Sequence, residues 1–174
     1  MKKFFNWILV LAAIVGAFYG VGLIVPRSQR LGSYTNLQAT PREVYAQLYD
    51  VESWDRWHPD FADLRELDEV DGQRRWRVTD KEGRTFELVE NEYEEERHWQ
   101  GSFEIEGSRT TYRIVVVGSG SGSRVTFKKT LDTRDPWVRA REFFTFGGGA
   151  TPLAILNALT AQLGETPAAV KDND

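Results

Sequence analysis

The chain has 174 residues and no cysteine, and its formal net charge is −4. All 26 acidic residues follow position 25, together with 20 of the 22 basic residues, so this part of the chain carries about −6. That charge argues against a nucleic-acid-binding surface and against a polybasic contact with anionic lipids, because both need a basic face. The absence of cysteine excludes disulfides, thiol catalysis and thiolate metal sites.

The N-terminal region contains an uncharged apolar run, FFNWILVLAAIVGAFYGVGLIV, at residues 4–25. Its 22 residues are close to the roughly 20 that cross the hydrocarbon core of a bilayer as a helix. Residues 1–27 are therefore predicted to be a membrane anchor with a single transmembrane helix.

Basic residues flank this run on both sides and determine its orientation only weakly. Lys2 and Lys3 precede it and Arg27 and Arg30 follow it, and we favour an N-terminus inside the cell. The expectation is a single-pass protein of the bacterial inner-membrane type with its soluble domain outside the cytoplasm. A cleaved signal peptide is the alternative, and a buried core helix is a third interpretation that the lack of polar residues disfavours.

A helix with an explicit start follows the first predicted strand, which begins in LGSYTNLQ at residues 31–38. Thr40 is placed as the N-cap, Pro41 as the first helical residue and Glu43 as the partner of Thr40 in a capping box. This pattern predicts a helix that ends near Asp50. The WDRW segment that follows predicts a second, short helical turn, which the next proline ends.

From about residue 64 to residue 131 the hydrophobic period becomes two, and each break in the pattern is a turn signal. Apolar and polar residues alternate in segments such as RRWRV and HWQGSFEI. The breaks are Asp71-Gly72, Glu82-Gly83, Gly107-Ser108 and the GSGSGS run at 118–123. The pattern predicts an antiparallel meander with one apolar face and one solvated face.

The C-terminal part is predicted to be helical and to cover the apolar face of the sheet. Asp135-Pro136 and Thr151-Pro152 each have the pattern of a helix start, and leucines recur at helical spacing after the second. Gly147-Gly148-Gly149 lies between them, and three glycines cost a helix about 3 kcal/mol relative to alanine, so we expect a break or kink there. The domain is expected to span residues 28–164, with a disordered tail over 165–174.

A strand, two short helices, six strands and a long C-terminal helix form the element order of the helix-grip fold. The segment TPREVYAQLYDVESWDRWHPD places Asp50, Trp54, Trp57 and Pro59 in the spacing D-x-x-x-W-x-x-W-x-P. With this motif, residues 31–164 resemble the SRPBCC superfamily, which includes START lipid-transfer domains, birch-pollen-allergen-like proteins and the polyketide cyclase/dehydrase and lipid transport-like group. The resemblance implies an α+β helix-grip fold, with a curved antiparallel sheet wrapped around a long C-terminal helix. It is specific for the fold and not for an activity.

The resemblance also implies a cavity for a hydrophobic ligand between the sheet and the helix, whereas the sequence itself shows only that both are rich in large apolar groups. The ligand-binding candidates are Trp54, Trp57, Phe86, Leu88, Trp99, Phe103, Tyr112, Ile114, Phe127, Phe143, Phe146, Leu156 and Leu159. Tyr112, Glu90 and Lys129 fall on the predicted inner register, where a few polar groups would orient a ligand. For each apolar candidate, a plain core position is the alternative. The two tryptophans of the motif wedge the helices against the sheet, line the mouth of the cavity, or do both.

The sequence offers little for metal binding or nucleophilic catalysis. His58 and His98 are not spaced as a metal pair, and no G-x-S-x-G elbow occurs. We therefore expect no metal, no cofactor and no catalytic residues. The acidic run ENEYEEER at 90–97 lacks the ligand pattern of an EF-hand and is interpreted as the exposed end of a hairpin.

The functional hypothesis is a membrane-tethered domain that binds or transports a lipid or other hydrophobic small molecule without catalysing a reaction. Its expected partners are that ligand and the membrane, reached through the N-terminal helix, and not nucleic acid. One alternative is an enzyme of the polyketide cyclase or dehydratase kind, in which Tyr112, Glu90 or His58 acts as general acid or base. Another is a sensing or scaffold domain with a vestigial pocket, which would contact a protein partner through the acidic hairpin.

Overall fold

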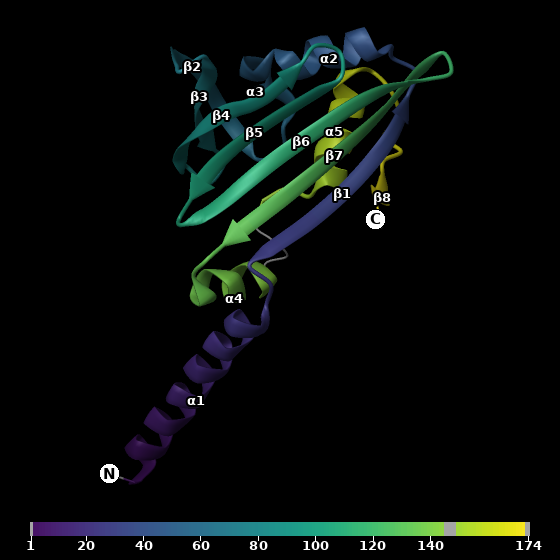
Figure 1. The fold of residues 1–174 in the computed structure, drawn as a ribbon. Coiled ribbons are helices and arrows are strands. Elements are labelled where there is room, and N and C mark those ends of the chain that lie inside the picture. Colours follow the sequence, from purple (N-terminus) through teal and green to yellow (C-terminus); the bar gives the residue numbers. More distant parts are fainter. Residues whose placement is uncertain (1, 145–148, 173–174) are drawn as a thin grey trace.

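The computed structural model describes residues 2–144 and 149–172 and shows an α+β helix-grip fold, which confirms the predicted fold class (Figure 1). The helices are α1 (Lys2–Ile24), α2 (Pro41–Tyr49), the single turn η1 (Val51–Ser53), α3 (Trp54–Trp57), α4 (Pro136–Phe144) and α5 (Pro152–Gln162). The strands are β1 (Ser28–Leu37), β2 (Phe61–Val70), β3 (Gln73–Asp80), β4 (Thr85–Glu94), β5 (His98–Ile105), β6 (Ser108–Ser119), β7 (Gly122–Thr133) and β8 (Val170–Asp172).

The strands form one antiparallel sheet in the order β2-β3-β4-β5-β6-β7-β1-β8. Strands β2 to β7 follow the chain as a meander, and β1 pairs with β7 with Ser28 opposite Asp132. The turns fall at the predicted breaks, where Gly72, Gly83 and Gly107 adopt the positive φ that glycine tolerates best. The first strand was expected to begin within residues 31–38, and β1 instead begins at Ser28.

The predicted start of α2 is confirmed in atomic detail. The Thr40 hydroxyl accepts a hydrogen bond from the Glu43 backbone N–H at 3.3 Å, and the Glu43 carboxylate accepts one from the Thr40 backbone N–H at 2.8 Å. Both bonds satisfy backbone donors that a helix start leaves without an intrahelical partner. They fix the first turn of α2.

The main core lies between the inner face of the sheet and helices α2, α3 and α5. Trp54 is completely buried, and its indole N–H donates to the Leu48 carbonyl at 3.1 Å. Its ring packs against Trp57 at 5.6 Å and Trp99 at 5.0 Å between centroids. The tryptophans of the sequence motif therefore join the α2–α3 corner to the sheet.

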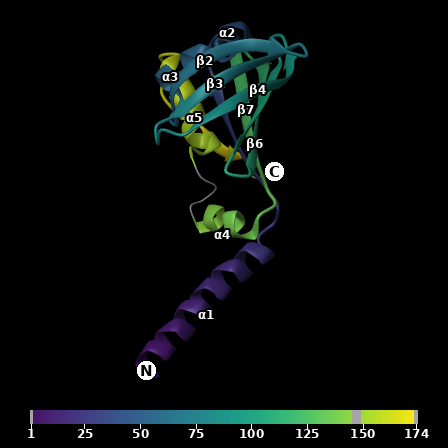
Figure 2. The same ribbon diagram turned by 90° about the vertical axis from the view of Figure 1, so that its left-hand side faces the viewer.

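The C-terminal helical region is divided into two helices that pack against different partners. Helix α5 covers the sheet, whereas α4 leaves the body and packs against the last turns of α1 (Figure 2). Gly149 has a φ of +67°, and Gly147 and Gly148 lie outside the described residues. The expected break between the helices is thus present, but only the second helix covers the apolar face of the sheet.

A disordered tail was expected over residues 165–174, but the structure shows ordered contacts within residues 165–172. The Glu165 carboxylate accepts hydrogen bonds from the backbone N–H groups of Gln38 and Ala39 at 2.9 and 2.8 Å. Strand β8 then pairs with β1, with Lys171 opposite Ser33. No periodic signal predicts this pairing, because a three-residue strand is too short to show one.

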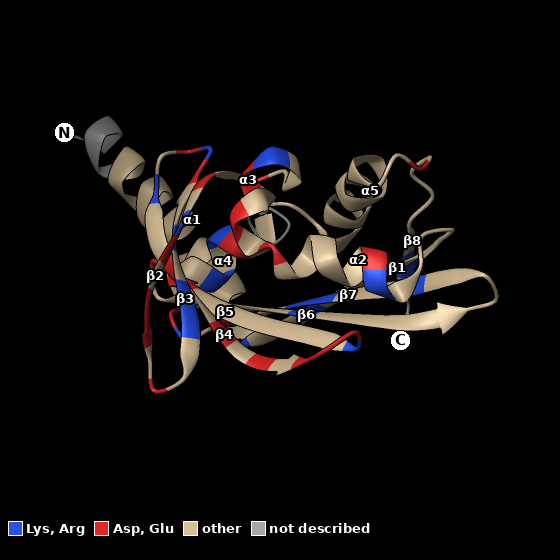
Figure 3. Cartoon of the chain, turned by 90° about the horizontal axis from the view of Figure 1, so that it is seen from above, with Lys and Arg blue, Asp and Glu red and all other residues tan. Residues whose placement is uncertain are grey.

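Helix α1 projects away from the body of the domain, and its apolar side chains are largely exposed (Figures 1 and 2). Its segment Asn6–Ile24 has 19 residues and a mean hydropathy of 2.3, which suits a membrane span. A signal sequence would have the same length and composition. Figure 3 shows that the charged residues are spread over the sheet and over α2, α3 and α4, whereas α5 and the part of α1 from Asn6 to its end carry no charge.

Candidate functional site

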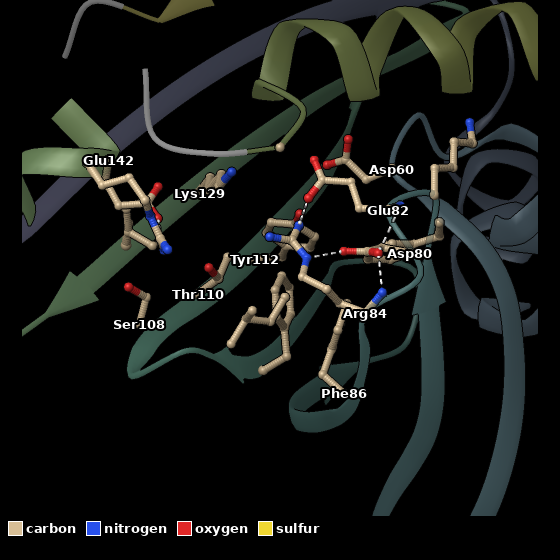
Figure 4. A pocket seen from close by; sticks show the side chains of 17 residues that line it. Asp60, Asp80, Glu82, Arg84, Phe86, Ser108, Thr110, Tyr112, Lys129 and Glu142 are labelled. Carbon is tan, nitrogen blue, oxygen red and sulfur yellow. Dashed lines mark hydrogen bonds and ion pairs between the residues drawn. The ribbon is translucent and has the colours of Figure 1, made fainter. Parts of the chain in front are cut away.

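A pocket of about 130 Å³ lies between the inner face of the sheet and the start of α5 (Figure 4). Its apolar floor is formed by Phe86 of β4, Phe103 of β5 and Tyr112 of β6. The centroids of Phe86 and Phe103 lie 4.7 Å apart, and those of Phe103 and Tyr112 lie 5.3 Å apart. The two-residue alternation of neighbouring strands places these rings on one face.

One wall of the pocket holds the beginning of α5 through a single peptide unit. The Lys129 ammonium donates to the Ala150 carbonyl at 3.4 Å, and the Asp60 carboxylate accepts from the Ala150 backbone N–H. Burial lowers the pKa of Lys129, although the charges of Asp60 and Glu142 oppose this shift. Burial also raises the pKa of Tyr112, to which the charge of Asp60 adds.

The rim of the pocket is ionic. The Asp80 carboxylate accepts from the Arg84 guanidinium at 2.7 Å and from the backbone N–H groups of Glu82 and Arg84. Burial favours the neutral acid, but the hydrogen bonds and charge of Arg84 lower the pKa of Asp80 overall. Arg141 of α4 bonds to the carboxylates of Glu106 and Glu142 and closes the rim near β5 and β6.

His58 lies behind this pocket in a place that the sequence did not reveal. It is 1% exposed, and its ring stacks on Phe61 with centroids 3.9 Å apart. Its Nδ1 accepts from the Asp60 backbone N–H at 3.2 Å, and its Nε2 has no hydrogen-bond partner among the described residues. Burial, together with the charges of Lys129 and Lys81, lowers the pKa of His58 to about 3.

Replacing His58 with phenylalanine is expected to flatten the dependence of stability on pH. In the wild type the unfolded chain binds a proton at His58 below about pH 6.5, whereas the folded chain does not until about pH 3. Stability therefore falls as pH drops through this window, by up to about 1.4 kcal/mol per pH unit for one group. Denaturant unfolding of both proteins between pH 4 and pH 7 measures the difference in slope, and equal slopes would contradict the buried neutral histidine.

A second, larger hollow lies beside the first, on the side of the domain that faces α1 and α4. This groove has a volume of about 610 Å³ and a mostly apolar lining. Leu31 of β1, Phe143 and Phe144 of α4, and Pro152 and Leu153 of α5 form its apolar walls. Glu142 lines both hollows, so the groove and the pocket meet at the end of α4.

The structure separates the predicted ligand-binding residues into three groups. Phe86, Phe103 and Tyr112 line the pocket, and Phe143 lines the groove. The remaining described candidates are buried in the core and line neither hollow: Trp54, Trp57, Leu88, Trp99, Ile114, Phe127, Leu156 and Leu159. Phe146 lies outside the described residues.

Of the three polar residues predicted on the inner register, Tyr112 and Lys129 line the pocket. Glu90 instead accepts a hydrogen bond from the Trp99 indole at 2.7 Å and lines neither hollow. Sequence reasoning missed Ser108 and Thr110, although the same alternation that placed Tyr112 inward places them there. It also missed Asp60 and the ionic rim, which carry no periodic signal because they lie at strand ends and turns.

Among the described residues, no group of three or more histidine, aspartate or glutamate side chains is arranged to hold a metal ion. His58 is enclosed by aromatic rings, and the His98 ring lies between Glu92 and Glu94 at the hairpin surface. The polar groups of the pocket are instead arranged as ion pairs and backbone hydrogen bonds.

The profile of the family described as "Polyketide cyclase / dehydrase and lipid transport" matches residues 34–164. The chain belongs to this family. The matched part includes the α2–α3 corner, the whole lining of the pocket and six of the eleven residues that line the groove, and it leaves out α1. No curated protein matches the chain by sequence.

Solved structures show the same fold as this polyketide cyclase / dehydrase and lipid transport domain at low sequence identity. The Zhui aromatase/cyclase from Streptomyces sp. R1128 is 14% identical with a TM-score of 0.64, and the match covers 79% of this chain and 94% of that one. TTHA0849 from Thermus thermophilus is 17% identical with a TM-score of 0.61, covering 78% and 97%.

The di-domain aromatase/cyclase StfQ from the steffimycin biosynthetic pathway is 12% identical with a TM-score of 0.60. That match covers 77% of this chain and 50% of StfQ, so this family member spans about half of the di-domain protein. At these identities the likeness establishes the fold of the polyketide cyclase / dehydrase and lipid transport domain and leaves its ligand open.

Proposed function

We propose that the protein is a membrane-tethered domain that binds a lipid or another hydrophobic small molecule without catalysing a reaction. Helix α1 is the tether, and the ligand occupies the groove between β1, α4 and α5. The observation that carries the proposal is this groove, because its volume of about 610 Å³ and its apolar lining suit a small-molecule ligand.

The packing of α1 supports a retained anchor over a cleaved signal. Phe18 stacks on Trp137 and Phe144 of α4, with centroids 5.7 and 5.6 Å apart. A Cβ atom at Gly22 would lie 1.8 Å from the Pro136 carbonyl oxygen, so the two backbones meet where glycine alone fits. A signal that is removed has no need of such contacts with the mature domain.

The pocket beside the groove supports an amphipathic ligand. At about 130 Å³ the pocket is too small for a whole lipid and large enough for a polar end group. Its lining is balanced between four acidic residues (Asp60, Asp80, Glu82 and Glu142) and four basic residues (Lys81, Arg84, Lys129 and Arg141). This balance favours an uncharged end group with hydroxyl or carbonyl oxygens, with the apolar chain in the groove.

A non-catalytic role agrees with the state of the polar groups. Asp60 and Lys129 hold the Ala150 peptide unit, and Asp80 is paired with Arg84. The raised pKa of Tyr112 makes it a poor proton donor at neutral pH. These contacts hold the wall of the pocket in place.

The enzyme of the cyclase or dehydratase kind is the second candidate, because Lys129 lines the pocket and its pKa is lowered. Tyr112 of β6 lies opposite Lys129 of β7, and an amine beside a phenol is a candidate acid–base pair. The two functions differ in what happens to the bound molecule. Mass spectrometry of the ligand before and after prolonged incubation detects a chemical change for the enzyme and no change for the carrier.

A charge placed in the groove is expected to abolish ligand binding. The Leu153→Asp variant puts a carboxylate against the apolar walls, whereas Ala154→Asp puts the same group at the next, exposed position in the first turn of α5. A carboxylate in the first turn of a helix is tolerated in both variants. Native mass spectrometry of the full chain, released from its own membranes in mild detergent, measures the co-purified ligand.

The proposal predicts a stoichiometric lipid-like mass in the wild type and in Ala154→Asp, and its loss in Leu153→Asp. If Leu153→Asp and Ala154→Asp carry the same amount of bound ligand, the groove is not the binding site. An absence of any bound mass in the wild type after incubation with mixed lipids would contradict the carrier function itself.

A further inference from the structure

Helix α4 exposes an aromatic face beside the end of α1. Trp137, Phe143 and Phe144 are 43%, 52% and 55% exposed. The residues that α4 buries are Arg139, Ala140 and Glu142, which is the reverse of an ordinary surface helix. An exposed apolar face of this kind indicates a surface that contacts another apolar partner and not water.

The exposed face continues the apolar surface of α1. Phe18 contacts both Trp137 and Phe144, and the centroids of Tyr19 and Trp137 lie 5.3 Å apart. The face is therefore joined directly to the segment that suits a membrane span. Aromatic rings are enriched at the membrane–water interface, where an apolar ring lies beside polar head groups.

The depth of this contact matches that of an interfacial helix. Phe18 precedes the last residue of the apolar segment, Ile24, by six positions. At a rise of 1.5 Å per residue, this places its ring about 9 Å below the end of the span. Amphipathic helices at membrane surfaces bury their apolar face by about 5–10 Å.

The polar surroundings of α4 are compatible with this depth. The exposed side chains of Arg27, Arg30 and Arg134 lie at the junction of α1 with the domain, where cationic groups reach the head groups. Asp135 is engaged locally, because its carboxylate accepts from the Trp137 backbone N–H at 2.7 Å. Because the domain as a whole is acidic, we attribute the contact to the burial of apolar side chains and not to attraction by anionic lipids.

We infer that α4 is an interfacial helix whose Trp137, Phe143 and Phe144 face contacts the bilayer around the exit of α1. The inference rests on the part of the proposed function that places α1 in a membrane. Phe143 and Phe144 also form a wall of the groove. The same two side chains thus join the bilayer to the groove, and a lipid chain reaches the groove from the leaflet without crossing water.

Single cysteines test this contact in the full chain, which has no native cysteine. We would place a bimane fluorophore at Phe144→Cys on α4, at Val10→Cys within α1 and at Val117→Cys, which is 56% exposed near the far end of β6. The labelled proteins are reconstituted into phosphatidylcholine vesicles with or without a spin label on the acyl chains. Aqueous iodide serves as the second quencher.

The expected result is that the lipid-borne spin label removes most of the emission at Phe144→Cys and Val10→Cys, and almost none at Val117→Cys. Iodide should quench Val117→Cys several-fold more strongly than Phe144→Cys. Quenching of Val10→Cys by lipid without quenching of Phe144→Cys would overturn the inference and leave the tether intact. A lack of lipid quenching at Val10→Cys would instead contradict the membrane tether, and the inference with it.

Discussion

Replacing Trp54 with alanine is expected to lower the free energy of unfolding by about 3–5 kcal/mol, the usual range for truncating a buried aromatic residue. Trp54 is completely buried and packs against Trp57, Phe61 and Trp99. Its loss also leaves the Leu48 carbonyl without the indole donor. Domains are commonly stable by about 5–15 kcal/mol, so the change removes a large share. Guanidinium unfolding of the full chain in mild detergent, followed by circular dichroism, measures it.

Trp137→Ala is the matched control, because it removes the same side chain from an exposed position on α4. The unfolding midpoint of the sheet domain is expected to stay close to that of the wild type, since Trp137 packs on α1 and not on the main core. If Trp54→Ala lowers the free energy of unfolding by less than about 1 kcal/mol, the corner formed by Trp54 and Trp57 is not part of the core. The interpretation that these tryptophans line the mouth of the cavity is then the better one.

Filling the pocket is expected to weaken ligand binding at least about tenfold, which corresponds to about 1.4 kcal/mol. Thr110 lines the pocket and is 6% exposed, so a phenylalanine at this position projects a ring into a space of about 130 Å³. The ring then occupies the volume that the polar end of the ligand needs. Titration of the full chain in nanodiscs with the lipid identified by mass spectrometry measures the dissociation constant.

Thr111→Phe tests whether such an effect belongs to the pocket. Thr111 is the next residue on β6 and lies on the opposite, partly exposed face of the sheet. The same substitution there adds the same ring to a strand with the same pairing, and affinity is expected to remain unchanged. A ligand that binds Thr110→Phe as tightly as the wild type occupies the groove alone and leaves the pocket empty.

The architecture could be predicted because local signals agreed with one another. The capping box of Thr40 and Glu43, the two-residue alternation and the glycine turns each specify their own element, and the structure confirms all of them. A sheet with one apolar face then needs a helical cover. Each of these elements could be predicted from residues that are close together in the sequence, without knowing which distant residues contact them.

The hollows could not be predicted to the same degree, because they depend on which large side chains fill the inner face. Leu88 and Ile114 alternate in the same way as Phe86 and Tyr112, yet the first pair is covered by the core and the second pair lines the pocket. The two-residue alternation predicts which face of the sheet a side chain lies on, but it does not predict which side chains it contacts there. The burial of His58 was not predicted for a related reason, since it results from the folded corner and not from any periodic pattern.

The position of α4 shows the same limit. Its aromatic residues were expected to cover the sheet, because an apolar helix face indicates only that something apolar lies opposite. In the structure the opposite surface belongs to α1, which is more than a hundred residues earlier in the chain. The glycine run correctly separated the two helices but carried no information on where the first of them packs.

The connection between α1 and β1 limits how far the domain can travel. Only Val25, Pro26 and Arg27 lie between Ile24 and Ser28, and such a connection spans at most roughly 14 Å even when fully extended. The Thr133 backbone N–H donates to the Arg27 carbonyl at 2.9 Å, which shortens this connection further. With α1 in a bilayer, the domain can diffuse along the membrane but stays at its surface, so the proposed ligand cannot cross the aqueous space inside it. A bound molecule can be passed on only to an acceptor that comes to the membrane surface itself.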